Sequence, residues 1–212
     1  MDLTVKVKAS GVNNLSDARY FSTFVEWMGF DFRRKSAMAL RIPVAQEIIG
    51  WLVGPQLVAE FANESAADIN AVCNALAITC IQVEEEVSLD ELAPIIETVI
   101  LRITMNELID VDRLQSILST QSTWANYFLL DFTENKLTWA AIKQREDLTV
   151  QDLQQFCKDY PIIVQLDFTP QNVSEIVTTL QPQAINLLGG SEEKVGLRAF
   201  DDIDPIVEVL EL

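Results

Sequence analysis

The chain has 212 residues, of which 49% are hydrophobic, and this length is enough to bury the core of one domain. Its 15 basic and 32 acidic residues give a formal net charge of −17, which repels nucleic acid, anionic membranes and phosphorylated metabolites. Histidine is absent, so the commonest general base near neutral pH and the commonest metal ligand are both missing. We therefore predict a single domain over residues 1–212, with no nucleic-acid partner, no metal and no cofactor.

The amino terminus, MDLTVKVKAS, lacks the basic and then apolar layout of a secretory signal. No apolar run reaches the roughly 18 residues that cross a bilayer. Cys73, Cys80 and Cys157 lie in apolar stretches without close pairing, where a thiol usually packs as a small hydrophobic group. These features predict a cytoplasmic protein with buried free thiols and no membrane partner.

Short β-rich runs alternate with segments of helical periodicity along the whole chain. The predicted strands are LTVKVKA (3–9), MGFDF (28–32), QLVAEFA (56–62), AITCIQV (77–83), TVILRIT (98–104), NYFLLDF (126–132), PIIVQLDF (161–168) and AINLL (184–188). The predicted helices are 16–27, 43–52, 65–75, 88–96, 110–119, 149–158, 170–180 and 202–211. Several begin with capping signals, such as Ser65, Asp110 and Ser88 with Glu91 three residues later.

Eight such units in about 210 residues favour a closed, parallel, eight-stranded (β/α)8 TIM barrel. An open doubly wound sheet is the alternative, and the lack of a GxGxxG motif after any strand weakens its nucleotide-binding form. In a barrel the functional groups lie at the carboxyl ends of the strands. The candidates there are Lys8, Ser10 and Asn13; Arg33, Arg34, Lys35 and Arg41; Gln82 and Glu84 to Glu86; Arg102; Asp131; Gln165 and Asp167; and Gly189, Gly190 and Ser191.

Several motifs resemble those of phosphoribosylanthranilate isomerase, in order, over nearly the whole chain. They are VKVKASGVNNLSDARYF, MGFDF, ANESAADI, IQV, FLLD, PIIVQLDFTPQNVSEIV and QPQAINLLGGSEEKVGL. The resemblance implies a barrel related to the enzymes that perform an Amadori rearrangement in tryptophan biosynthesis. In that family an acid opens the sugar ring by protonating its oxygen, and a base removes a proton from the adjacent carbon.

The family's base is a cysteine in a Lys-x-Cys-Gly motif, and its acid is an aspartate that ends strand six. The resemblance places Ser10 at the base position, in Lys8-Ala9-Ser10-Gly11, and Asp131 at the acid position. A serine hydroxyl needs a neighbouring general base to become reactive. Lys8 is on the same strand face as Ser10 and is a candidate for that role, but Ser10 and Gly11 also suit a simple turn. Asp131 is either a general acid or a residue that caps the next loop or meets an arginine.

The resemblance also locates binding positions and their departures from the family pattern. The phosphate loop after strand seven has no glycine here and carries Asp167, whereas Gly189, Gly190 and Ser191 keep the phosphate-binding character after strand eight. The glycine-rich loop after the acid is replaced by residues 133–139. Met38 stands where the family has an arginine that binds the anthranilate carboxylate, leaving Arg33, Arg34, Arg41 and Arg102 as cationic candidates.

Because these departures concentrate at the site, we predict an isomerase-like barrel whose ancestral activity is lost or strongly altered, a pseudoenzyme candidate. Two alternatives stay open: an active isomerase that uses Ser10 and Asp131, and a non-catalytic binding or scaffold protein. A small-molecule ligand at the barrel mouth is expected in the first two readings, and a monomer or a homodimer is compatible with each. We also expect that Ser10→Cys alone does not restore turnover.

Overall fold

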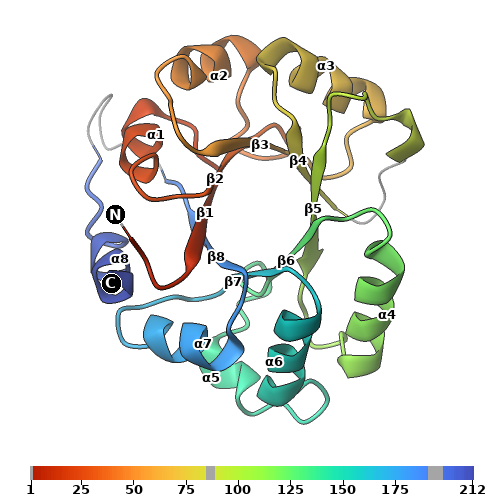
Figure 1. The fold of residues 1–212 in the computed structure, drawn as a ribbon, viewed down its shortest axis with the longest axis vertical. Helices are drawn as coiled ribbons and strands as arrows, with labels where there is room; N and C mark the ends of the chain where they lie inside the picture. Colours follow the sequence, from red (N-terminus) through yellow and green to blue (C-terminus); the bar gives the residue numbers. More distant parts are fainter. Residues whose placement is uncertain (1, 85–88, 191–197) are drawn as a thin grey trace. The chain divides into compact units, whose positions relative to one another are not determined.

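The computed structural model describes residues 2–84, 89–190 and 198–212. Its strands follow one another in the order β1 to β8 in a closed barrel (Figure 1), which confirms the predicted (β/α)8 architecture. The chain divides into two compact units, which we call unit 1 (residues 7–100 and 187–200) and unit 2 (residues 2–6, 101–186 and 201–212). That all residues form a single domain stays a prediction.

Unit 1 contains the first four βα repeats. Its elements are β1 (Lys6–Ser10), α1 (Leu15–Phe21), β2 (Trp27–Asp31), α2 (Ile42–Ile49), β3 (Gln56–Glu60), α3 (Ala66–Leu76), β4 (Cys80–Val83) and the 3-10 turn η1 (Leu89–Glu91). Strand β2 pairs in parallel with both β1 and β3, and β3 with β4, so that Asp31, Glu60 and Gln82 lie side by side at the carboxyl ends of three neighbouring strands. This register brings polar residues together at one end of the unit.

Unit 2 contains the later repeats. Its elements are β5 (Thr98–Thr104), whose first residues belong to unit 1, then α4 (Val111–Gln121), β6 (Tyr127–Asp131), α5 (Trp139–Ile142), α6 (Val150–Asp159), β7 (Ile162–Gln165), α7 (Val173–Leu180), β8 (Ala184–Leu188) and α8 (Asp204–Leu210). Strand β7 pairs in parallel with β6 and β8, and Asp131 is in register with Gln165. Helices α6 and α7 lie outside these strands (Figure 1).

Helix ends follow the capping residues that the sequence offers. The side chain of Ser65 accepts a hydrogen bond from the backbone N–H of Asp68 at the start of α3, and Asp110 accepts one from Arg113 at the start of α4. Thr149 and Asp152 form a reciprocal capping box at α6. These caps place the helices where the sequence predicts them, within a few residues.

Several predicted elements are wrong in extent. The helix expected over 88–96 is only η1, because Pro94 lacks a backbone N–H and its ring clashes with a preceding helical turn; its expected cap, Ser88, lies outside the described residues. The helix expected over 16–27 ends at Phe21, and β2 begins at Trp27. Strand β1 begins at Lys6 because Leu3 instead pairs antiparallel with Glu211.

Candidate functional site

In unit 1, Lys8 and Glu60 form an ion pair inside the β-strand layer. Their side chains are 0% and 2% exposed, and Lys8 Nζ lies 2.5 Å from Glu60 Oε1. The second carboxylate oxygen, Oε2, accepts a hydrogen bond of 3.0 Å from the backbone N–H of Gly11. Lys8 Nζ also donates to Ser10 Oγ. Lys8, which the sequence analysis names as the candidate base for Ser10, therefore acts as a hydrogen-bond donor to it.

The close approach of Glu60 to β2 depends on Gly29. A Cβ atom at that position would overlap the Glu60 carboxylate. The absence of a side chain at Gly29 thus leaves the space through which Glu60 reaches Lys8. An ammonium that donates to a carboxylate and a hydroxyl offers no lone pair to accept a proton, since lysine in this state has donors only. The geometry favours a structural role for Ser10.

A second ion pair ends β2, where Arg33 folds back on the fully buried Asp31. Arg33 donates through Nε to Oδ1 at 2.9 Å and through Nη2 to Oδ2 at 2.8 Å, and Ser36 Oγ lies 2.5 Å from Oδ2. Burial alone raises the pKa of Asp31, but the hydrogen bonds from Arg33 and Ser36 outweigh it and lower that pKa below 3.8. The hydrogen bond that Arg33 donates to Asp31 raises the pKa of Arg33. Arg33 is thus held by an internal carboxylate.

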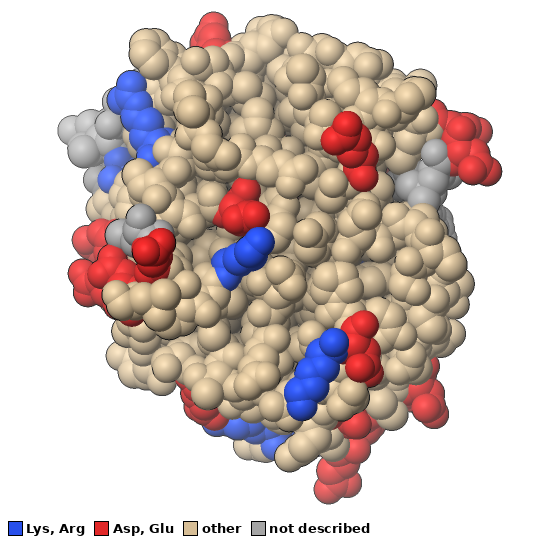
Figure 2. Space-filling view, in the orientation of Figure 1, with Lys and Arg blue, Asp and Glu red and all other residues tan. Residues whose placement is uncertain are grey.

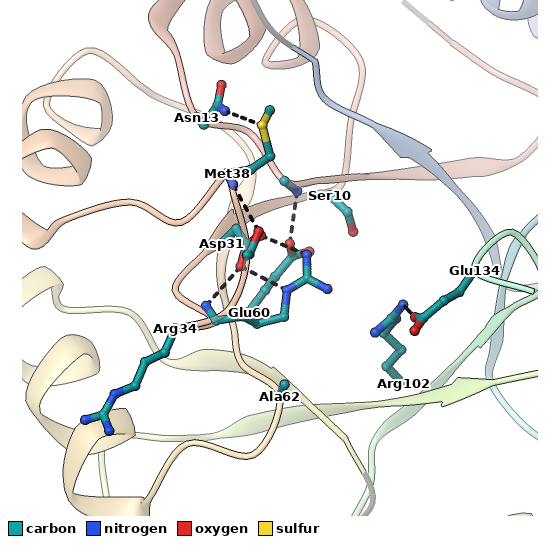
Figure 3. Close-up of polar contacts among 12 residues, drawn as sticks. Ser10, Asn13, Asp31, Arg34, Met38, Glu60, Ala62, Arg102 and Glu134 are labelled. Atoms are coloured by element: carbon teal, nitrogen blue, oxygen red, sulfur yellow. Dashed lines mark hydrogen bonds and ion pairs between the residues drawn. The ribbon is translucent and has the colours of Figure 1, made fainter.

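The other cationic candidates of unit 1 lie at the surface. Arg34 is exposed and binds Asp68 through Nη2 at 2.6 Å. Arg41 is exposed and is the residue that precedes α2. Met38, at the position of the family's arginine, accepts a 3.4 Å hydrogen bond at Sδ from Asn13 (Figure 3). The structure does not bring Arg34 and Arg41 to the Lys8–Glu60 pair.

The glycines that follow β8 bind residues of their own chain. The N–H of Gly189 donates to Ser10 O at 2.7 Å, and the N–H of Gly190 donates to Asp17 Oδ2 at 2.9 Å. Arg198 Nη1 binds the other oxygen of Asp17, and both side chains are buried. A Cβ on Gly190 would lie 2.8 Å from Arg198 Cζ. Ser191, the third predicted binding residue of this loop, lies outside the described residues.

In unit 2, Asp131 is 1% exposed and accepts hydrogen bonds on both carboxylate oxygens. Arg102 donates to Oδ2 from Nε at 3.1 Å and from Nη2 at 2.6 Å. The backbone N–H and the hydroxyl of Thr133 donate to Oδ1 at 2.8 and 2.7 Å. Arg102 also binds Glu134 (Figure 3). Both oxygens of Asp131 thus accept hydrogen bonds from groups of the same chain.

A directional chain of hydrogen bonds ends on the same carboxylate. Asn186 Nδ2 donates to Gln165 Oε1 at 2.6 Å, and Gln165 Nε2 donates to Thr133 Oγ1 at 2.6 Å. Thr133 Oγ1 in turn donates to Asp131 Oδ1. Bonds aligned in one direction polarise one another, so each strengthens the next. The chain spans β6, β7 and β8 and holds Asp131 in place.

The loops after β6 and β7 differ from glycine-rich anion-binding loops. Lys136 has a φ of 57°, a left-handed conformation that glycine would adopt at lower cost. Asn135 ties this loop to the backbone carbonyl of Met105 at 2.9 Å. Asp167 is exposed and accepts a 2.8 Å hydrogen bond from the N–H of Trp139 at the start of α5. Here the Asp167 carboxylate, not a free anion, binds this N–H group.

Among the residues of these networks that were not singled out from the sequence are Glu60, Asp17 and Arg198. The sequence does mark Glu60 as unusual, because it is the single charged residue in the predicted strand QLVAEFA. Asp17 lies in the helix that follows the first strand, and Arg198 lies 181 positions further on, so their pairing has no local signal. Gln82 was a candidate by position; its Oε1 is buried without a hydrogen-bond partner in the described part of the chain.

On the face that Figure 2 shows, Lys and Arg atoms appear in small separate groups among widely spread Asp and Glu side chains. Among residues 2–84, 89–190 and 198–212, no group of three or more Cys, Asp and Glu side chains is placed to hold a metal ion. Glu85 and Glu86, named after strand four, lie outside the described residues. No helix in the described ranges has the length and apolar character needed to cross a membrane.

No protein-family model and no curated protein sequence matches the chain. Similar solved structures include the phosphoribosylanthranilate isomerase of Thermotoga maritima, 21% identical, with 97% of this chain and 98% of that chain covered and a TM-score of 0.75. A second phosphoribosylanthranilate isomerase, in complex with reduced 1-(o-carboxyphenylamino)-1-deoxyribulose 5-phosphate, is 21% identical over 97% of both chains with a TM-score of 0.72.

The orotidine 5'-monophosphate decarboxylase of Sulfolobus solfataricus is also similar, at 10% identity, with 87% of this chain and 88% of that chain covered and a TM-score of 0.58. Enzymes with different reactions therefore share this architecture, and at these identities the likeness shows the fold. The chain has the (β/α)8 fold of these phosphoribosylanthranilate isomerases, the enzymes that its motifs resemble, at an identity of 21%.

Proposed function

We propose that this chain is a divergent phosphoribosylanthranilate isomerase-like barrel that does not catalyse the Amadori rearrangement. The observation that carries the proposal is the surrounding of Asp131, the position of the family's acid. Its two oxygens accept bonds from Arg102 and from the N–H and hydroxyl of Thr133. A general acid must carry a proton and direct it at the substrate. Both oxygens of Asp131 are instead engaged by donors of the same chain, so neither is directed at a substrate.

The position of the base supports the same conclusion independently. Ser10 accepts a hydrogen bond from Lys8, whose ammonium is also paired with Glu60. General-base activation of a serine needs a neighbouring acceptor for the hydroxyl proton. Lys8 donates a hydrogen bond to this hydroxyl, so the Ser10 oxygen is the acceptor in this contact. Both groups that the family uses are thus engaged in internal ion-pair networks.

The experiment is complementation of a tryptophan auxotroph that lacks the isomerase, combined with a turnover assay on the purified chain. The isomerase of Thermotoga maritima serves as the positive control. We expect no growth without tryptophan from the natural chain or from its Ser10→Cys variant, although both are expressed in folded form. Growth supported by the natural chain and abolished by Asp131→Asn would overturn the proposal, because it would show that Asp131 still acts as the acid.

The remaining assignments rest on composition and on the resemblance. We propose that the chain acts in the cytoplasm, as a monomer or a homodimer, and that any small-molecule ligand differs from the phosphorylated ligand of the similar isomerase. A net charge of −17 disfavours anionic ligands in general. A measurement of mass in solution and a screen of neutral against phosphorylated compounds address these points.

A further inference from the structure

Met38 differs in exposure from the other methionines of the described residues. Met28 and Met105 are 0% exposed, whereas Met38 is half-buried, and Met1 lies outside the described residues. A thioether reacts with peroxide through a lone pair on its sulfur, so the oxidant must reach that atom. Exposure thus separates Met38 from the two buried methionines.

An amide donor is directed at the Met38 sulfur. Asn13 Nδ2 donates to Met38 Sδ at 3.4 Å (Figure 3). The orientation of the Asn13 amide is set by Asn14, whose Nδ2 donates to Asn13 Oδ1 at 2.9 Å. Asn14 is itself fixed as the cap of α1, because its Oδ1 accepts from the N–H of Asp17 at 2.8 Å. A thioether sulfur is a weak acceptor, so this well-placed donor makes only a weak hydrogen bond.

The backbone of Met38 is held to the end of β2. Its N–H donates to Ser36 Oγ at 3.1 Å, and that hydroxyl donates to Asp31 Oδ2 at 2.5 Å. The N–H of Leu40 donates to the carbonyl of Asp31 at 2.7 Å. The side chain of Met38 can still rotate, since methionine is unbranched and has three rotatable bonds. The Asn13–Met38 contact therefore joins the loop that follows β1 to a fixed loop that follows β2.

We infer that Met38 is a peroxide-sensitive oxidation site whose sulfoxide is held by Asn13. A lone pair of Sδ attacks one oxygen of hydrogen peroxide, so that an S–O bond forms, the O–O bond breaks and the other oxygen leaves as water. The sulfur is oxidised and the peroxide is reduced. Rotation of the Met38 side chain brings the new oxygen, a stronger acceptor than sulfur, to Asn13 Nδ2. Oxidation thereby strengthens the link between the loops after β1 and β2, and the inference goes beyond the proposed function without depending on it.

The test treats the folded chain with hydrogen peroxide and follows each methionine by peptide mass spectrometry, the Asn13 side-chain amide by ¹⁵N NMR, and thermal unfolding. We expect one added oxygen on Met38 while Met28 and Met105 stay unmodified, together with a downfield shift of the Asn13 amide proton. Asn13→Asp removes the N–H donor but keeps the oxygen that accepts from Asn14. Oxidation should lower the melting temperature of Asn13→Asp by about 2–4 °C more than that of the natural chain, which corresponds to the loss of one hydrogen bond in a chain of this size.

Met28→Leu is the matched control, since it removes a fully buried methionine and should respond to peroxide as the natural chain does. Met38→Leu should lose the shift of the Asn13 signal. If Asn13→Asp does not fold, Asn13→Ala also removes the donor and is tested in the same way. Oxidation of Met28 or Met105 as fast as that of Met38 in the folded chain, or an equal fall in melting temperature with and without the Asn13 amide, overturns the inference. These readouts involve no turnover, so complementation by the natural chain would refute the proposed function and leave these expectations unchanged.

Discussion

The pairing of Lys8 with Glu60 predicts a large loss of stability on replacing Glu60 by glutamine. Glutamine keeps the size of the side chain but removes the charge that balances Lys8, which is fully buried. At 2.5 Å, Coulomb's law with an effective dielectric constant of about 20 gives an attraction of roughly 7 kcal/mol. Most of that attraction offsets the desolvation of the two ions, so the pair itself adds little net stability.

Removal of one partner is different, because the desolvation cost of the other remains. We expect Glu60→Gln to lower the free energy of unfolding by about 3–5 kcal/mol, measured by urea denaturation. For a chain of this length that corresponds to a fall in melting temperature of roughly 6–20 °C. The double variant Lys8→Met/Glu60→Leu should regain most of the loss, since an apolar pair of similar volume has no charge to desolvate.

Glu175→Gln is the matched control. Glu175 pairs with Lys143 at 3.0 Å, but the two side chains are 48% and 46% exposed. Such a surface pair is worth at most about 1 kcal/mol, so its loss should be small. A cost for Glu60→Gln that is as small as the cost of the control would refute the reasoning, because Lys8 would then not depend on Glu60 as its counterion.

Two further predictions concern titratable groups. The pKa of Asp31 is lowered below 3.8, so its hydrogen bonds contribute stability that is full above about pH 5 and is lost as the pH falls below 3.8. The difference in unfolding free energy between the natural chain and Asp31→Asn should therefore shrink between about pH 5 and pH 3, and an unchanged difference would contradict this account. Burial raises the pKa of Cys73 to about 11 and that of Cys80 to about 12. Both thiols should resist a disulfide reagent in the folded chain near pH 8 and react once urea is added; fast labelling of either without urea would show that the site is open.

Periodicity located the strands well and the helices less well. Strands β5 and β8 have the predicted bounds, because apolar runs flanked by polar residues mark a strand from local sequence alone. Strand β4 begins at Cys80 and not at residue 77, since Ala77 adopts the left-handed conformation that ends α3. The four-residue α5 has too few turns to show a helical period. Cys73 and Cys80 are buried as expected, whereas Cys157 is half-buried.

The chemistry of the candidate site was harder to predict than its location. The position of Lys8 two residues before Ser10 predicts a shared strand face, and the structure brings the two side chains together. Glu60 reaches Lys8 over 52 positions of chain, and it does so only because Gly29 leaves space. Sequence periodicity gives the face of a strand on which a residue lies, but not which residue of another strand it meets. The side chains that contact Ser10 and Asp131 could therefore be identified only from the three-dimensional structure.

The buried ion pairs also determine whether, under the proposed function, single substitutions can restore the isomerase reaction. Several buried charged side chains are held by a partner of opposite charge: Lys8 by Glu60, Asp131 by Arg102 and Asp17 by Arg198. A single reverting substitution that separates a pair leaves the other charge buried alone, at a cost of about 3–5 kcal/mol. That is a large part of the stability of an ordinary domain. Under the proposed function, regaining the reaction would thus require coordinated changes in both members of several pairs, which selection acting on single mutations does not supply.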